Sequence, residues 1–168
     1  GFTSLVRTEP LALEILAAAV PQHEVMIIDL RVDPTPLGKM MEDFRPELVG
    51  VTGYTTDVPR MLQIVAEVKA HDPHATTVAG GYHASLVPED FDTPAVDVIV
   101  VGEGEETFAE LVDCLAQGGD LAKVRGIVYH VQGRPVATPM RPLARSMDAL
   151  PLPARYLTDH YRSRYHFH

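Results

Sequence analysis

Three short segments of this sequence carry most of the residues that could hold a ligand. They are "TGYTTD" at 52–57, "GGYHAS" at 80–85 and "GEGEET" at 102–107. Each segment follows an apolar run and begins with a glycine or a small hydroxyl residue. Backbone groups and hydroxyls can therefore face a ligand with no large side chain between them. The pattern predicts a narrow, deep ligand slot.

The elements that must position these segments alternate between strands and helices. We expect helices near 10–21, 34–46, 57–68 and 106–119. We expect apolar strands at 3–8, 23–30, 47–54, 75–81 and 96–102. Strands separated by helices predict an α/β, Rossmann-like (flavodoxin-like) fold, with a five-stranded parallel sheet and helices on both faces.

The end of the sequence has a different character. Residues 126–139 predict a hairpin that turns at Gln132-Gly133, and the proline-rich segment after it predicts an extended arm. We therefore expect a binding domain over 1–125, and a hairpin and linker over 126–168.

Composition narrows the classes of partner. The chain has 168 residues, 46% of them hydrophobic, which is enough for one globular domain. Its net charge of −9 disfavours nucleic acid and anionic membranes. The apolar segment 10–20 is too short to span a bilayer and contains Glu14. One cysteine excludes an internal disulfide or a multi-cysteine metal site in this chain, and fits a reducing cytoplasm. The start at Gly1 suggests a piece of a longer protein.

Charge also narrows the class of ligand. A diphosphate cofactor calls for a glycine-rich loop after the first strand, and "RTEPLA" has no glycine. The carboxylates of Glu103, Glu105 and Glu106 would repel several phosphates but can accept hydrogen bonds from amides or sugar hydroxyls. A response regulator needs an aspartate where the third strand ends, and Thr52 stands there instead.

The motifs together resemble one family. "GVTGYTTDVPRM", "VAGGYHASLVPEDF", "VDVIVVGEGEETFAEL" and "MDALPLPAR" are similar to the N-terminal cobalamin-binding domain of cobalamin-dependent radical S-adenosylmethionine enzymes. That family includes methylases and the anaerobic magnesium-protoporphyrin monomethyl ester cyclase. The resemblance runs from about residue 5 to the end of the chain.

The resemblance implies that the nucleotide tail of a corrinoid enters the carboxyl edge of the sheet. Thr52 would contact the buried dimethylbenzimidazole, and Gly80 and Gly81 would let the tail pass against the backbone. His83 would contact the tail or the corrin rim; alternatively, it caps a turn without touching a ligand. The implied cofactor-binding residues are Thr8, Glu9, Thr52, Gly53, Tyr54, Thr55, Thr56, Gly80, Gly81, Tyr82, His83, Ala84, Gly102, Glu103, Gly104, Glu105 and Thr107.

Two departures from related families limit the expected chemistry. The histidine of the DxHxxG motif, which supplies the lower cobalt ligand in methionine synthase and the mutases, is missing from "TEPLALE". By resemblance, the cobalamin would be base-off without a histidine ligand, as suits methylcobalamin chemistry. The CxxxCxxC motif for a [4Fe–4S] cluster is also missing. We expect this chain to bind cobalamin without catalysis, while a C-terminal radical S-adenosylmethionine barrel in the parent holds cluster and S-adenosylmethionine.

Other interpretations stay open. A stand-alone corrinoid carrier would normally use the missing histidine motif, and a flavodoxin-like nucleotide or flavin domain would need a phosphate loop after the first strand. In a pure interaction domain, apolar packing would explain the glycines, but not why all three central strand ends carry them.

Several other residues could carry chemistry, but each has a simpler structural role. We expect Cys114 to be a buried structural thiol, Asp57 a helix cap, and Met40 and Met41 packing residues. The spacing of His160, His166 and His168 is weak evidence for a metal, so no metal site is assigned.

Overall fold

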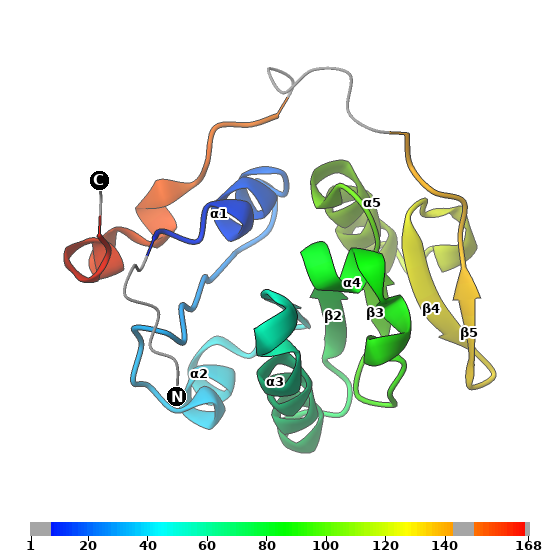
Figure 1. Ribbon diagram of the computed structural model, residues 1–168, viewed down its shortest axis with the longest axis horizontal. Coiled ribbons are helices and arrows are strands. Elements are labelled where there is room, and N and C mark those ends of the chain that lie inside the picture. Colours follow the sequence, from blue (N-terminus) through cyan, green and yellow to red (C-terminus); the bar gives the residue numbers. More distant parts are fainter. Residues whose placement is uncertain (1–7, 143–149, 167–168) are drawn as a thin grey trace. The chain divides into compact units, whose positions relative to one another are not determined.

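The computed structural model describes residues 8–142 and 150–166, so most of the predicted strand 3–8 lies outside the described residues. The chain divides into two compact units (Figure 1). The larger unit spans 36–145, and the smaller one joins the N-terminal 35 residues to the segment from residue 146 onward.

The larger unit is built around a five-stranded sheet in the order β1-β2-β3-β4-β5 (Figure 1). Its elements are α2 (Leu37–Phe44), β1 (Leu48–Thr52), α3 (Val58–His71), β2 (Thr76–Gly80), α4 (Tyr82–Leu86), β3 (Val98–Val100), α5 (Gly104–Ala116), β4 (Ile127–Val131) and β5 (Arg134–Ala137). The first three strands are parallel. β4 and β5 are antiparallel to their neighbours.

The predicted hairpin forms and joins the sheet, so the expectation of an all-parallel sheet is wrong. Gln132 and Gly133 have φ values of 52° and 74°, as a two-residue hairpin turn of type I′ requires. Such a turn makes β4 and β5 antiparallel, with Val131 opposite Arg134 and His130 opposite Pro135. β4 then pairs with β3, and the hairpin supplies two of the five strands.

Helices cover both faces of the sheet. Neighbouring residues of a strand point to opposite sides, so each strand contributes side chains to both packed layers. Ala79 and Ile99 pack with Met61 and Val65 of α3. On the other face, Val78, Val98 and Val100 pack with Leu111 of α5. The predicted α/β, Rossmann-like class with helices on both faces is confirmed.

Local signals in this unit mostly acted as expected. α2 ends at Arg45, whose left-handed φ of 52° lies directly before Pro46. Met40 and Met41 are buried, as predicted. Cys114 is only half-buried, although it packs against the core beside Leu111, because α5 presents it at the border of its apolar face.

The smaller unit contains α1 (Leu11–Ala18) and the 3₁₀ turns η5 (Arg155–Leu157) and η6 (Asp159–Arg164). The predicted strand at 23–30 is wrong: these residues form no strand in the described chain. Their apolar side chains do alternate in burial, but a strand also needs a hydrogen-bonded neighbour, and among the described residues none pairs with this segment.

The segment after residue 150 folds against the N-terminal segment. Ala154 packs with Ala17 and Ile27. The Thr158 hydroxyl donates a hydrogen bond to the buried carboxylate of Glu14. Contacts between residues this far apart in sequence make one compact unit from the two ends of the described chain. The predicted arm therefore contains two helical turns as well as extended backbone.

Asp29 gives this unit a predicted dependence on pH. Burial raises the pKa of Asp29, but the hydrogen bonds and the positive charge of Arg31, with a smaller contribution from Tyr165, lower that pKa below its usual value. Because the folded pKa is depressed, the stabilisation is present above about pH 4 and is lost as the pH falls through the folded pKa. We expect Asp29→Asn to cost about 1–3 kcal/mol and to flatten this acid dependence.

Hydrogen exchange of the amides in 155–165, measured between pH 6 and pH 3, checks this prediction. Asp159→Asn is the control, because Asp159 is exposed and its ion pair with Arg162 is long, at 3.9 Å. Equal effects of the two substitutions would count against a special role for Asp29.

Thr77 ties β2 to the segment before β3. Its hydroxyl is fully buried, lies 2.7 Å from the Ala95 carbonyl oxygen and accepts a hydrogen bond of 3.2 Å from the Asp97 amide. We expect Thr77→Val to remove the hydroxyl donor of the Ala95 carbonyl oxygen, while the Asp97 amide keeps its hydrogen bond of 3.1 Å to the Thr77 carbonyl oxygen. The free energy of unfolding should fall by about 1–3 kcal/mol. Urea unfolding followed by circular dichroism measures the loss. Thr76→Val is the matched control, with an expected change below about 0.5 kcal/mol.

Candidate functional site

The parallel register brings two of the predicted loops together. Thr52 ends β1 directly beside Gly80, which ends β2. Gly81 has a φ of +100°, and a Cβ built on it would overlap the Thr52 hydroxyl oxygen. This position therefore requires glycine for the fold itself. At Gly80 a Cβ would meet only Val100, at an ordinary contact distance of 3.7 Å.

Ser85 joins the third loop to the second. Its hydroxyl donates to the Gly81 carbonyl oxygen over 2.9 Å and accepts a hydrogen bond of 2.9 Å from the Gly102 amide. The structure thus brings all three strand-end loops to one edge of the sheet. Ser85 was not among the predicted site residues, although its position four residues after Gly81, on a short helix, is a signal for such a contact.

Two tyrosines and a threonine on these loops are open to solvent. Tyr54 is 75% exposed and Tyr82 is 69% exposed. Thr52 is also exposed. These groups are available to a ligand at the carboxyl edge. Thr56 is exposed as well, and Gly53 is half-buried.

His83 is occupied by protein contacts. Its Nδ1 lies 3.1 Å from the Thr55 hydroxyl, and its Nε2 lies 2.8 Å from a carboxylate oxygen of Asp90. The ring is 8% exposed and packs edge-on against Phe91. Both ring nitrogens thus have partners within this unit. This arrangement favours the alternative in which His83 orders the loop without touching a ligand.

The loop 52–57 is fixed by Asp57 in a different way from the one expected. Asp57 occupies the N-cap position of α3, but its side chain makes no capping hydrogen bond to that helix. Its carboxylate instead accepts a hydrogen bond of 2.8 Å from the Tyr54 amide. A Cβ at Gly53 would lie 2.8 Å from the Asp57 Cβ, so this turn also needs glycine.

The start of α5 forms the third side of the site. Gly102 and Glu103 are exposed, whereas Gly104 and Glu105 are half-buried. Thr107 is fully buried, and its hydroxyl accepts a hydrogen bond of 3.1 Å from Nε of Arg141. Ala84, another predicted site residue, is fully buried in the core. These last two therefore position the loops and do not face solvent.

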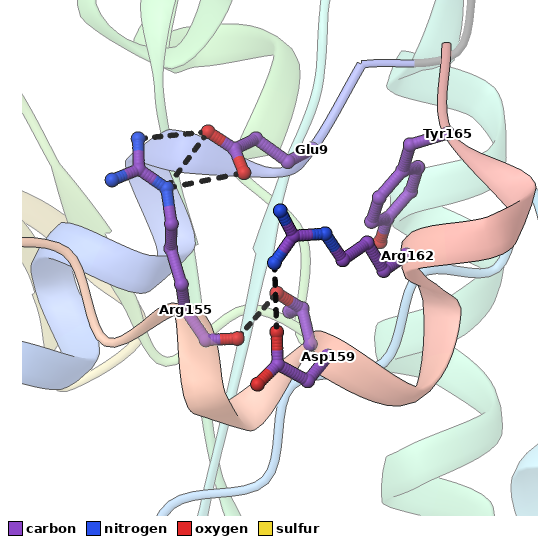
Figure 2. A pocket seen from close by; sticks show the side chains of 6 residues that line it. Glu9, Arg155, Asp159, Arg162 and Tyr165 are labelled. Carbon is purple, nitrogen blue, oxygen red and sulfur yellow. Dashed lines mark hydrogen bonds and ion pairs between the residues drawn. The ribbon is translucent and has the colours of Figure 1, made fainter. Parts of the chain in front are cut away.

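Thr8 and Glu9 belong to the smaller unit, where they have partners of their own. The Thr8 carbonyl oxygen accepts a hydrogen bond of 2.8 Å from Arg31. Glu9 pairs with Arg155 at 2.9 Å and lines a pocket of about 340 Å³ (Figure 2). Across this pocket, Arg162 lies 3.9 Å from Asp159. Carboxylates and guanidinium groups thus face each other within the pocket.

Neither unit presents a metal cluster in its described residues: no three His, Cys, Asp or Glu side chains are grouped closely enough to hold an ion. His168 lies outside the described residues. Within the same ranges, no helix is both long and apolar enough to cross a membrane.

The arrangement at the carboxyl edge is suited to binding. Glycine backbone, an exposed threonine hydroxyl and exposed tyrosine rings line the edge, and the one histidine of these loops is buried and bonded. Such a surface can hold a ligand rich in amides and hydroxyls and leave its reactive part free.

Comparisons with known proteins agree with this interpretation. The sequence matches the family described as "B12 binding domain" over residues 2–112. It is 36% identical over 151 residues to an uncharacterized methyltransferase from Pyrococcus horikoshii. This match covers 86% of the chain and 33% of the methyltransferase. It is also 36% identical over 115 residues to the anaerobic magnesium-protoporphyrin IX monomethyl ester cyclase of Rubrivivax gelatinosus, covering 63% of this chain and 20% of the cyclase.

A solved structure has the same fold. The cobalamin-dependent S-adenosylmethionine radical enzyme OxsB, with aqua-cobalamin and S-adenosylmethionine bound, superposes with a TM-score of 0.76 at 21% identity. The match covers 91% of this chain and 22% of OxsB. The chain thus spans a third or less of the length of these proteins. Since the family match extends over about two thirds of its residues, the chain belongs to the B12-binding domain family.

Proposed function

We propose that this chain is the cobalamin-binding module of a radical S-adenosylmethionine enzyme. It holds base-off cobalamin by the nucleotide tail and presents the cobalt for methyl transfer to carbon. When bound, the cobalamin supplies the methyl-carrying cobalt chemistry, and the residues of this chain bind and orient it. The parent is a methyltransferase or a cyclase, and the single cysteine of this chain fits a reducing cytoplasm.

The observation that carries this proposal is the contrast between the paired glycines. Gly81 is required by the protein itself, because of its positive φ and its contact with Thr52. Gly80 has an ordinary φ and room for a Cβ. A glycine with room for a Cβ, at the end of a central strand and beside an exposed hydroxyl, fits a position where a ligand must approach the backbone.

The other residues of the edge fit the same ligand. Cobalamin carries many amide groups and a single phosphodiester, and the acidic loop 102–107 offers carboxylates that accept hydrogen bonds from amides. Thr52 offers a hydroxyl to the buried end of the tail. Tyr54 and Tyr82 provide exposed rings on the loops that follow β1 and β2. The division at residue 125, into this binding domain and a linker toward the barrel, stays a prediction.

Gly80→Val tests the route of the tail. Because a Cβ at this position meets only Val100, at an ordinary contact distance, we expect the chain to stay folded but to have at least a tenfold weaker affinity for hydroxocobalamin, or about 1.4 kcal/mol. A visible-absorption titration of the purified chain measures the affinity. Gly38→Val is the matched control: Gly38 lies in α2, also with open space around it, so the affinity should not change.

Two results would contradict the proposal. A well-folded wild-type chain that shows no saturable binding would remove the ligand assignment. Equal affinities of wild type and Gly80→Val would keep the ligand but reject the threading of its tail past this glycine.

His83→Gln tests the cobalt coordination. Since both ring nitrogens bond to Thr55 and Asp90, we expect bound cob(II)alamin to show the same base-off absorption and electron paramagnetic resonance spectra as with the wild type. The free energy of unfolding should fall by about 0.5–1.5 kcal/mol, because the hydrogen bonds of the buried ring are lost while water can replace them at the exposed Thr55 and Asp90. If the spectra of the variant show that cobalt has lost a nitrogen ligand, His83 coordinates the cobalt.

A further inference from the structure

The segment that follows the hairpin runs beside the candidate site, although it lies outside the part of the chain that matches the B12-binding family. The Pro139 carbonyl oxygen accepts a hydrogen bond of 3.0 Å from the Gly126 amide. The Met140 methyl group lies 3.4 Å from the point where a Cβ of Gly102 would stand. This places Arg141 next to the first turn of α5.

Arg141 holds that turn with all three nitrogens of its guanidinium group. Nε donates to the Thr107 hydroxyl over 3.1 Å, and Nη1 donates to Glu106 over 3.2 Å. Nη2 forms a close ion pair with Glu110. The side chain of Arg141 is 20% exposed, whereas those of Glu106 and Glu110 are 66% and 43% exposed, so water screens the carboxylates more than the guanidinium group. A planar fork of donors suits such a set of acceptors better than a lysine would.

The charges at this end of α5 give Arg141 a second role. Glu103, Glu105, Glu106 and Glu110 lie within eight residues of sequence, at the loop that the proposed function assigns to a ligand with one negatively charged phosphodiester. Unlike charges attract and like charges repel over these distances, more strongly where water is partly excluded. Arg141 offsets the two carboxylates that it contacts.

We propose that Arg141 is a positioning residue of the cobalamin site. It fixes the first turn of α5 and neutralises Glu106 and Glu110, so that the loop 102–107 accepts the phosphodiester of the nucleotide tail. This inference rests on the proposed function. It adds that Arg141, which lies outside the residues matched by the B12-binding family, balances the negative charge of the binding loop.

The test compares cobalamin with cobinamide, which lacks the nucleotide tail. For Arg141→Met we expect hydroxocobalamin to bind about tenfold more weakly at low salt, with a smaller loss in 0.5 M NaCl. Binding of cobinamide should change less than about twofold, since it carries no phosphodiester. Arg134→Met is the charge-matched control: Arg134 is exposed on β5, and its variant should bind both ligands as the wild type does.

Two further variants separate charge from simple loss of structure. Adding Glu106→Gln and Glu110→Gln to Arg141→Met should recover most of the affinity for cobalamin. The two glutamine substitutions alone should bind cobalamin at least as well as the wild type, and this prediction holds even if Arg141→Met folds poorly. Circular dichroism and thermal melting monitor the fold of each variant.

The outcomes are distinct. If the wild-type chain binds no cobalamin, the proposed function fails and this inference with it. If the wild type binds cobalamin but Arg141→Met binds it equally well, only the inference fails. It also fails if Arg141→Met weakens cobalamin and cobinamide to the same extent at every salt concentration, because Arg141 would then act through the fold alone.

Discussion

The close approach of Gly81 to Thr52 constrains the whole carboxyl edge of the sheet. The parallel pairing of β1 with β2 sets these residues next to each other, and the left-handed backbone of Gly81 turns the chain away into α4. A side chain at this point would be strained by the positive φ and would displace the Thr52 hydroxyl. Ser85 then fixes the loop after β3 to the loop after β2. The three loops therefore form one surface whose shape is set by the protein's own contacts.

The sequence was informative where the structure depends on local patterns. Buried parallel strands read as short apolar runs, so β1, β2 and β3 were found, and the Gln132-Gly133 pair identified the hairpin. The three strand-end loops were found because glycine after an apolar run has few other uses. The segment 23–30 was misjudged because alternation in burial does not reveal whether a strand has a neighbour.

The residues that sequence reasoning missed act over long separations. Arg141 contacts Thr107 and Glu110 more than thirty residues away, and Thr158 contacts Glu14 across 144 residues. No local period or motif marks such pairs. His83 illustrates a different limit: its place beside a glycine pair suggested a ligand contact, whereas the fold gives both of its nitrogens protein partners, Thr55 and Asp90. Its role toward a ligand stays a prediction. Spacing indicates which residues meet at an edge, whereas their partners come only from the fold.

The position of Pro135 has a consequence for how this sheet behaves in a crowded solution. In the hairpin, Val131 and Arg134 form the hydrogen-bonded pair next to the turn, so the backbone nitrogen of the next residue on β5 faces away from β4. β5 is the last strand of the sheet in the described chain, and at this point its outer side has a proline nitrogen with no hydrogen to donate. A strand from another molecule would find one donor missing there. Pro135 thus fits the hairpin and also discourages intermolecular strand addition and aggregation at this edge.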